Sequence, residues 1–234
     1  MAVTDEAILQ IKAMIISGEL APGDRLPPEK ELSERLGLSR NSMREAIKAL
    51  EVIRVLDVRQ GDGTYVTSLE PRLLVEAITF VVDLHTDSSV IELFAVRRIC
   101  EGAAAGMAAG KISADEIQSL RAHIGAASSA DSVEDLVAHD LEFHGQIAVA
   151  SGNSYLAALV QSLSSNTVRA RIWRGLTQSN AVSQTLEEHK AIVDALEIGD
   201  ARLAESLAVT HIAGVERWLR DNVQFLEGCF AHDS

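Results

Sequence analysis

The sequence predicts a mainly α-helical protein in two parts: three helices with a β-hairpin, followed by an all-α helical bundle. Apolar residues recur at helical spacing along most of the 234 residues. Only residues 55–67 show β-rich runs around a glycine-containing turn. The 4 prolines and the 4% of aromatic residues disfavour a β-sandwich, whereas abundant alanine, leucine, isoleucine and glutamate favour helices.

The N-terminal part is predicted to hold three helices, at residues 5–17, 29–36 and 39–50. Gly18 ends the first helix, Gly37 ends the second, and Ser39 is a favourable N-cap for the third. The apolar pattern then changes to that of a hairpin, with strands at residues 55–58 and 64–67. Three helices, a tight turn between the second and third, and a hairpin form the outline of a winged helix-turn-helix. We assign this domain to residues 1–68.

The remaining residues, 69–234, show helical patterns only. Seven helices are predicted, at residues 71–84, 90–109, 114–127, 133–150, 155–175, 179–198 and 201–225. So many helices in one segment are enough to bury a core of their own, which predicts an all-α bundle as the second domain.

The net charge of −13 at first argues against a nucleic-acid binder. Its distribution changes that argument. Residues 1–67 carry a net charge of only −2, and residues 68–234 carry the other −11. The acidity therefore belongs to the predicted bundle and leaves the predicted winged helix free to bind a polyanion.

The sequence also predicts a cytoplasmic protein. The N-terminus lacks the basic and apolar regions of a signal peptide, and no apolar stretch is long enough to span a membrane. The 2 cysteines, Cys100 and Cys229, do not form a CxxC motif and are expected to be reduced thiols.

The third helix carries the strongest signal for DNA binding. Arg40, Arg44 and Lys48 follow one another at intervals of four and so form a single basic stripe. Arg40 and Asn41 lie in the first turn, from which a recognition helix reaches base edges: arginine pairs with guanine and asparagine with adenine. Four other residues are candidate phosphate contacts: Lys30, Ser39, Ser42 and Arg59. A solvated basic face is the alternative explanation of the stripe, but its combination with a turn and a wing favours DNA binding.

The elements LPPEKELSERLGLSR, SMREAIKALE and RQGDGTYV together resemble the DNA-binding domain of the GntR family of bacterial transcription regulators. The resemblance implies DNA contacts at Lys30, Ser39, Arg40, Asn41, Arg44 and Gly61. Lys30 departs from the family, which often has arginine there, and lysine cannot form a bidentate fork. Asp62 at the wing tip is acidic, so Gly61 is expected to approach the minor groove.

Three histidines and one aspartate could form a metal site in the bundle. Asp140 and His144 are four residues apart and share a helix face, while His189 and His211 lie on the two following long helices. Such a set suits Zn²⁺, Ni²⁺ or Mn²⁺. Spacing alone does not force the three helices to converge, and isolated, hydrogen-bonded histidines are the alternative.

The segments VRRICEGAAAGMAAG, DLEFHGQIAVASGN and EEHKAIVDALEIGD resemble the C-terminal FCD domain of the FadR subfamily. In metal-containing members, the resemblance places the ligands at Asp140, His144, His189 and His211. The acyl-CoA-sensing branch generally lacks this set and is the less similar one. A divalent ion there would leave a net positive charge that attracts a small carboxylate effector. The residues expected to contact the effector are Arg97, Asn166, Arg169 and Trp173; a salt bridge from Arg97 to Glu101 is the rival role.

These observations predict a homodimeric, ligand-responsive transcription regulator, most often a repressor in this family. It would bind a palindromic double-stranded DNA operator, a divalent metal ion and a small organic acid, without contacting a membrane. A metal-dependent hydrolase is the alternative from another class, but the sequence has no HExxH motif and Glu142 and Glu188 are expected to point away from the metal. The helix at 71–84 would couple the two domains.

Overall fold

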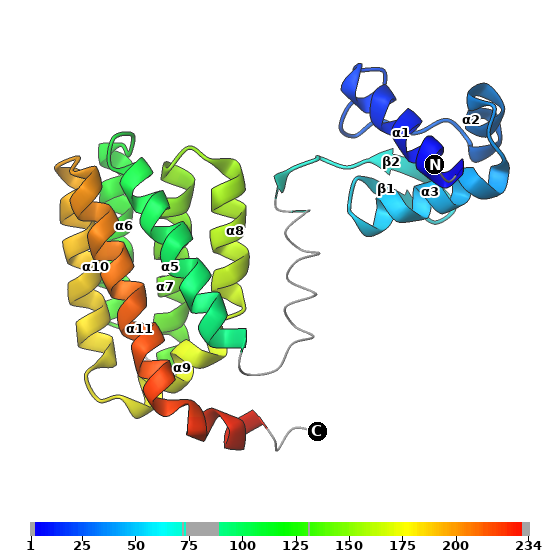
Figure 1. Ribbon diagram of the computed structural model, residues 1–234. Coiled ribbons are helices and arrows are strands. Elements are labelled where there is room, and N and C mark those ends of the chain that lie inside the picture. Colours follow the sequence, from blue (N-terminus) through cyan, green and yellow to red (C-terminus); the bar gives the residue numbers. More distant parts are fainter. Residues whose placement is uncertain (1–2, 72, 74–88, 131, 231–234) are drawn as a thin grey trace. The chain divides into compact units, whose positions relative to one another are not determined.

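The computed structural model describes residues 3–71, 73, 89–130 and 132–230. The chain divides into two compact units, Met1–Ala77 and Ile78–Ser234, which are described separately below (Figure 1). The helix predicted at 71–84 lies almost wholly outside the described residues, so its coupling role and the domain boundary at residue 68 stay predictions.

The N-terminal unit contains the three helices and the hairpin that the sequence predicts. The helices are α1 (Val3–Ile16), α2 (Glu29–Leu36) and α3 (Arg40–Val52), and the strands are β1 (Leu56–Arg59) and β2 (Gly63–Val66). The strands are antiparallel, with Leu56 opposite Val66 and Arg59 opposite Gly63. The helices and the hairpin bury one apolar cluster, which includes Ile11, Leu32, Met43, Leu56 and Val66. The cluster orients α3 and the hairpin relative to each other.

Two local features produce the tight turn between α2 and α3. Gly37 ends α2 in the left-handed region, at φ 67°, where a side chain would be strained. Ser39 then caps α3, since its hydroxyl accepts a hydrogen bond of 3.0 Å from the backbone N–H of Ser42. Both features are readable from the sequence, which is why the prediction of this turn is confirmed.

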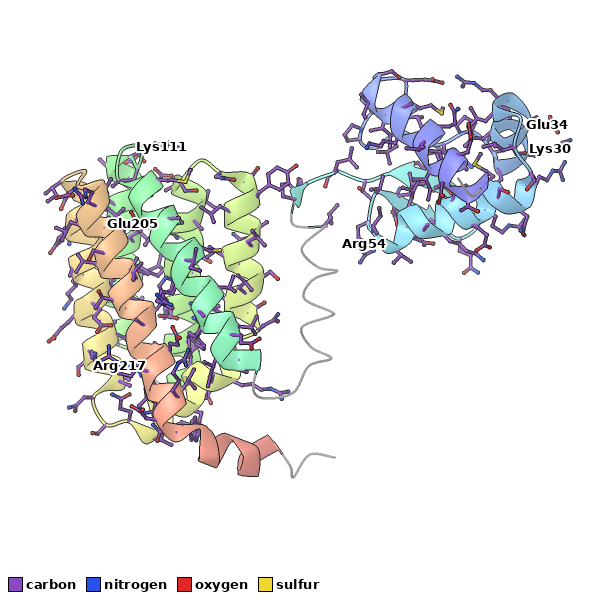
Figure 2. The ribbon with its side chains drawn as sticks, in the orientation of Figure 1. Lys30, Glu34, Arg54, Lys111, Glu205 and Arg217 are labelled. Carbon is purple, nitrogen blue, oxygen red and sulfur yellow. The ribbon has the colours of Figure 1, made fainter. Side chains whose placement is uncertain are left out.

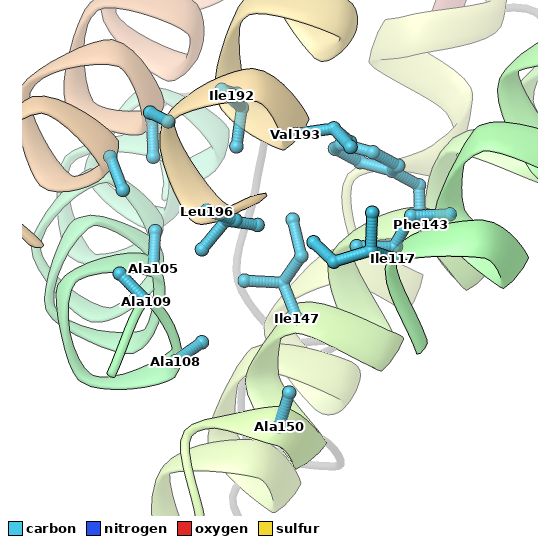
Figure 3. Packing of buried hydrophobic residues seen from close by; sticks show 14 of the residues in the cluster. Ala105, Ala108, Ala109, Ile117, Phe143, Ile147, Ala150, Ile192, Val193 and Leu196 are labelled. Carbon is cyan, nitrogen blue, oxygen red and sulfur yellow. The ribbon is translucent and has the colours of Figure 1, made fainter. Parts of the chain in front are cut away.

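The second unit is an all-α bundle. Its helices are α5 (Ser89–Ala108), α6 (Ala114–Ser128), α7 (Val133–Ala150), α8 (Ser154–Ser165), α9 (Val168–Thr177), α10 (Ala181–Glu197) and α11 (Ala201–Phe230). Its main core lies where α5, α6, α7, α10 and α11 meet, around residues such as Ala105, Ile117, Ile147 and Leu196 (Figure 3). Among the described residues, no helix is both long and apolar enough to cross a membrane.

The single helix predicted at residues 155–175 is wrong, because the structure divides this segment into α8 and α9. The break falls in a run of weak helix formers, Ser164 to Thr167. The hydroxyl of Thr167 donates to the carbonyl of Ser164 (3.0 Å), and that of Ser165 donates to the carbonyl of Ser162 (2.7 Å). Side chains that bond to the backbone in this way compete with helical hydrogen bonds. The break changes which residues of α9 face the core.

Glycines allow α5 and α11 to pack closely along the bundle. A Cβ atom on Gly102 would lie 2.5 Å from Cγ2 of Val209, and one on Gly106 would lie 3.3 Å from the carbonyl oxygen of Ala201. Gly125 on α6 has no such neighbour within 4 Å. The two glycines of α5 therefore serve the helix contact.

Replacing Gly102 with leucine should destabilise the bundle by about 1–3 kcal/mol, because the new side chain overfills the α5–α11 contact. The same substitution at Gly125 should be neutral or slightly stabilising, since leucine favours a helix more than glycine does. Thermal unfolding followed by circular dichroism measures both changes. Equal unfolding temperatures for the two variants would contradict the packing argument.

Candidate metal centre and helix-turn-helix surface

The exposed face of α3 presents the predicted DNA-contacting side chains. Arg40, Asn41 and Arg44 are exposed, whereas the opposite face of the helix buries Met43 and Ile47 in the unit's core. Lys30 is also exposed and extends outward from α2 (Figure 2). Burial of one face thus fixes the rotation of α3 about its axis, and the basic residues on the opposite face remain accessible to a ligand.

Weak ion pairs cover this basic face. Arg40 lies 3.9 Å from Glu34, Arg44 lies 3.4 Å from Glu29, and Lys48 lies 3.1 Å from Glu45. All these side chains are largely exposed to solvent, and exposed pairs of this kind contribute little stability. A phosphate or a base edge could therefore replace the carboxylates at small cost.

The wing tip is held by a residue that sequence reasoning missed, Arg25. Its guanidinium donates a hydrogen bond to the backbone carbonyl of Asp62, and a Cβ atom on Gly63 would lie 2.5 Å from its Nε. The Asp62 carboxylate accepts a hydrogen bond of 2.9 Å from the hydroxyl of Tyr65. Gly61 is exposed at φ 79°, a conformation that favours glycine. The carboxylate of Asp62 is thus hydrogen-bonded within the wing, and the backbone of Gly61 beside it is accessible.

The bundle brings all four predicted metal ligands together. Asp140 and His144 come from α7, His189 from α10 and His211 from α11; the four residues are buried, and one ligand atom from each lies within 4.8 Å of the others. Nε2 of His189 is 3.3 Å from both Nε2 of His211 and Oδ1 of Asp140. Helices far apart in the sequence therefore converge at one point.

Two carboxylates outside this set orient two of the histidine rings. Nδ1 of His144 lies 2.7 Å from Oε2 of Glu101, and Nδ1 of His211 lies 2.7 Å from Oε2 of Glu188. A proton on each Nδ1 directs the lone pair of Nε2 towards the centre, which is the usual arrangement around metal-binding histidines. The ring of His189 is held differently, since it stacks on Phe143 at 3.9 Å between ring centroids.

Sequence reasoning did not assign these orienting roles. The sequence predicts Glu101 only as a partner of Arg97, and it predicts that Glu188 points away, whereas Glu188 reaches the ring of His211. The available signal is their position, because Glu188 adjoins His189 and Glu101 lies in the VRRICE segment, four residues after Arg97. Neither position shows which histidine each carboxylate would reach.

The charges around the centre change the acidity of its members. Burial would raise the pKa of Glu101, but the charges of Arg97 and His144 outweigh it and hold that pKa well below its usual value. Burial would likewise raise the pKa of Asp140, which Arg171 and His144 hold well below the ordinary range. Burial would lower the pKa of His144, but the two carboxylates raise it to about 9. Both carboxylates are therefore ionised, and His144 takes up a proton when no cation compensates them.

The other two histidines behave in the opposite way. Burial lowers the pKa of His189 to about 4, despite its hydrogen bond to Asp140. Burial also lowers the pKa of His211, against the effect of Glu188. Both rings are neutral near pH 7 and so can act as ligands.

The donor set fits a divalent metal ion. Among the residues that the structure describes, Nε2 of His144 is buried without a hydrogen-bond partner, and Oδ1 of Asp140 is 3.5 Å away from it. Buried polar atoms in proteins are normally paired. A cation at the convergence point would satisfy this nitrogen, the two neutral histidines and the carboxylate at once. Three imidazoles and a carboxylate suit zinc, nickel or manganese.

A cavity lined by arginines lies beside the four ligands. Its lining includes Asp140 and His211 together with Arg97, Arg171 and Arg174, and apolar residues close the remaining sides. Arg97 donates to Glu101 at 2.7 Å and to the hydroxyl of Thr167 at 2.9 Å. The predicted rival salt bridge therefore exists, yet Nη2 of Arg97 remains buried without a partner among the described residues.

Arg171 on α9 lies between the cavity and the candidate metal ligands. It pairs with Oδ2 of Asp140 and donates to the carbonyl of Ser164. Burial and the neighbouring charge of Arg97 lower the pKa of Arg171 to about 10, so it remains a cation at neutral pH. Its contact with Asp140 connects the cavity directly to the candidate metal centre.

The predicted effector contacts Asn166 and Arg169 do not line this cavity. Arg169 is exposed on the outer side of α9, and Asn166 lies at the break between α8 and α9. Arg171 and Arg174 occupy the buried face instead. The sequence predicts one continuous helix through this segment and so gives no signal that singles these two arginines out.

Two family models match the chain. The model described as bacterial regulatory proteins, gntR family, matches residues 3–66, and that of the FCD domain matches residues 92–214. The first covers the helices and hairpin of the N-terminal unit, and the second covers the helices that carry all four candidate ligands.

Similar proteins support the same grouping. The chain is 30% identical to the HTH-type transcriptional regulator LutR of Bacillus subtilis, over 90% of this chain and 100% of that protein. It is 29% identical to the galactonate operon transcriptional repressor of Escherichia coli, over 93% of this chain and 97% of that protein. A solved structure of GntR from Streptococcus agalactiae shares 28% identity at a TM-score of 0.66, covering 92% of this chain and 99% of that one.

Proposed function

Since the chain belongs to the GntR family of bacterial regulatory proteins, and is thus a DNA-binding transcription regulator rather than an enzyme, we propose that its bundle senses a small carboxylate at a metal centre. The protein would act as a cytoplasmic repressor that responds to this effector. The observation that carries the proposal is the convergence of three histidines and an aspartate beside a cavity lined by arginines.

Six residues are assigned to DNA contact. Arg40, Asn41 and Arg44 read base edges in the major groove, because they are exposed on the outer face of α3 near its N-terminus. The others position the domain on the backbone or the minor groove: Lys30, Ser39 and Gly61. In a homodimer, two such surfaces would read the two halves of a palindromic operator.

In the bundle, Asp140, His144, His189 and His211 hold the divalent ion, and Glu101 and Glu188 orient two of the rings from behind. When bound, the ion would supply a positive charge that attracts a carboxylate. Nη2 of Arg97 is buried and free to donate to that carboxylate. The second candidate is a metal-free sensor of the acyl-CoA type. It is disfavoured because the converging histidine nitrogens would have no function in it.

The proposed homodimer has a candidate contact surface on α5. Val96, Ile99 and Met107 are 44%, 67% and 38% exposed, and their spacing places them along one face of the helix. Apolar side chains of this size on a solvent-facing stripe are typical of an interface between protein chains. Pairing of two copies through α5 would cover all three.

Replacing Arg40 or Arg44 with alanine should weaken operator binding by roughly ten- to hundredfold, because each arginine would lose a bidentate contact to a base. Arg35→Ala is the matched control, since Arg35 is an exposed arginine on α2 that pairs with Glu19. Electrophoretic mobility shift on the operator measures the change. Wild-type affinity in both α3 variants would refute the assignment of α3 as the reading helix.

The purified protein should contain about one divalent ion per chain, and His189→Ala should lose it, whereas His123→Ala should retain it. At pH 7, binding of the ion to metal-free protein should release about one proton, because the pKa of His144 is raised to about 9 and those of His189 and His211 are lowered. Metal affinity should therefore rise with pH up to about 9. Elemental analysis and titration calorimetry in buffers of different ionisation enthalpy test both statements. A wild-type protein that answers its effector without metal would contradict the sensing proposal.

Ile99→Glu should convert the dimer to a monomer, because a carboxylate would be buried in the apolar α5 surface. Ile198→Glu, at a residue that is 71% exposed beyond α10, should leave the assembly unchanged. Light scattering after size-exclusion chromatography gives the mass of each species. A dimeric Ile99→Glu protein would place the interface elsewhere.

A further inference from the structure

We infer that the effector carries two acidic groups, so that it is a short dicarboxylate rather than a monocarboxylate. The inference rests on the proposed function, since it concerns the same site. Three arginines line the cavity: Arg97, Arg171 and Arg174.

Three guanidinium groups line the cavity, and each has donors to spare. Nη2 of Arg97 and Nε of Arg171 are buried without hydrogen-bond partners among the described residues. Arg174 is only 5% exposed, and its Nε donates to the amide oxygen of Gln178 at 2.8 Å. In the part of the chain that the structure describes, no carboxylate lies within ion-pair distance of Arg174. Glu188 and Asp140 act on Arg174 only at longer range, because the first is bonded to His211 and the second to Arg171.

The formal charges give the same result. The three arginines and a divalent ion would contribute five positive charges at the site. Three carboxylates lie at the site and contribute three negative charges: Glu101 pairs with Arg97, Asp140 pairs with Arg171, and Glu188 bonds to His211. Two positive charges remain, and burying uncompensated charge is costly. A dianion would neutralise the site, whereas a monoanion would leave one guanidinium unpaired.

The positions of the arginines indicate where the two acidic groups bind. Arg97 and Arg171 contact Glu101 and Asp140, so they adjoin the metal ligands and would pair with the first group. Arg174 lies one turn further along α9, on the same face as Arg171, at a Cβ separation of about 5–6 Å. The second group would bind there.

Apolar residues restrict the space between the two ends. The lining contains Leu136, Val137, Ile212 and Val215 in addition to the charged groups. A hydrocarbon chain that joins two carboxylates complements such a surface, because its middle is apolar and its ends are charged. Arg174 is thereby assigned as the residue that determines specificity for the second acid group.

The test compares metal-loaded protein with matched pairs of acids that differ by one carboxylate: succinate with butyrate, malate with 2-hydroxybutyrate, and glutarate with valerate. Titration calorimetry and thermal shift should show at least tenfold tighter binding of the better dicarboxylate than of its partner. Arg174→Gln should remove this preference while leaving the metal content unchanged. Arg169→Gln is the control, because Arg169 is exposed on the same helix. If Arg174→Gln does not fold, Arg174→Lys retains a cation without the fork and should reduce the preference.

The outcomes separate this inference from the proposed function. A monocarboxylate that binds the metal-loaded wild type as tightly as its dicarboxylate partner overturns the inference and leaves the proposed function intact. An unchanged preference in Arg174→Gln overturns the role of Arg174. Failure of both acid classes to bind the metal-loaded wild type overturns the proposed function itself.

Discussion

The organisation of the bundle depends on one constraint, the burial of many charged or titratable groups at a single place. Arg97, Glu101, Asp140, His144, Arg171, Arg174, His189 and His211 are each less than a tenth exposed. Removing an ion from water costs several kcal/mol unless it is paired and hydrogen-bonded. The charges of these groups therefore have to compensate one another. Each ion pair joins two helices or positions a residue that does so.

The pairs form a continuous chain across the helices. Arg97 and Glu101 on α5 reach His144 on α7, Arg171 brings α9 to Asp140, and Glu188 on α10 meets His211 on α11. Close packing of α5 against α11, which Gly102 allows, holds the ends of this chain together. The apolar core around Ile147 and Leu196 stabilises the bundle, but the charged chain determines which side chains meet at its centre. A substitution at one member therefore leaves another buried charge unpaired.

Sequence reasoning succeeded where structure is determined locally and was incomplete where it is not. Gly37 and the Ser39 cap act within a few residues, so the turn before α3 could be predicted from them. The convergence of Asp140, His189 and His211 depends on three helices, and spacing alone left it open; the family resemblance supplied it. The arginines of α9 were missed for a physical reason: a continuous helix through Thr167 presents Arg169 differently from a helix that restarts there.

The short helix α9 carries two of the buried charges and has little apolar anchoring. It has ten residues and no side-chain cap at Thr167, and its buried face consists of Ala170, Arg171 and Arg174. Apolar anchoring comes mainly from Ala170 and from Trp173, whose ring lies 4.7 Å from that of Trp218 on α11. Two of its three inward side chains are thus charged, and they pack well only when counter-ions are present. A ligand shifts an equilibrium only by its difference in affinity between two states. An effector that neutralises the charges of α9 would bind more tightly to the state in which this helix is packed, and a sensor requires such a difference.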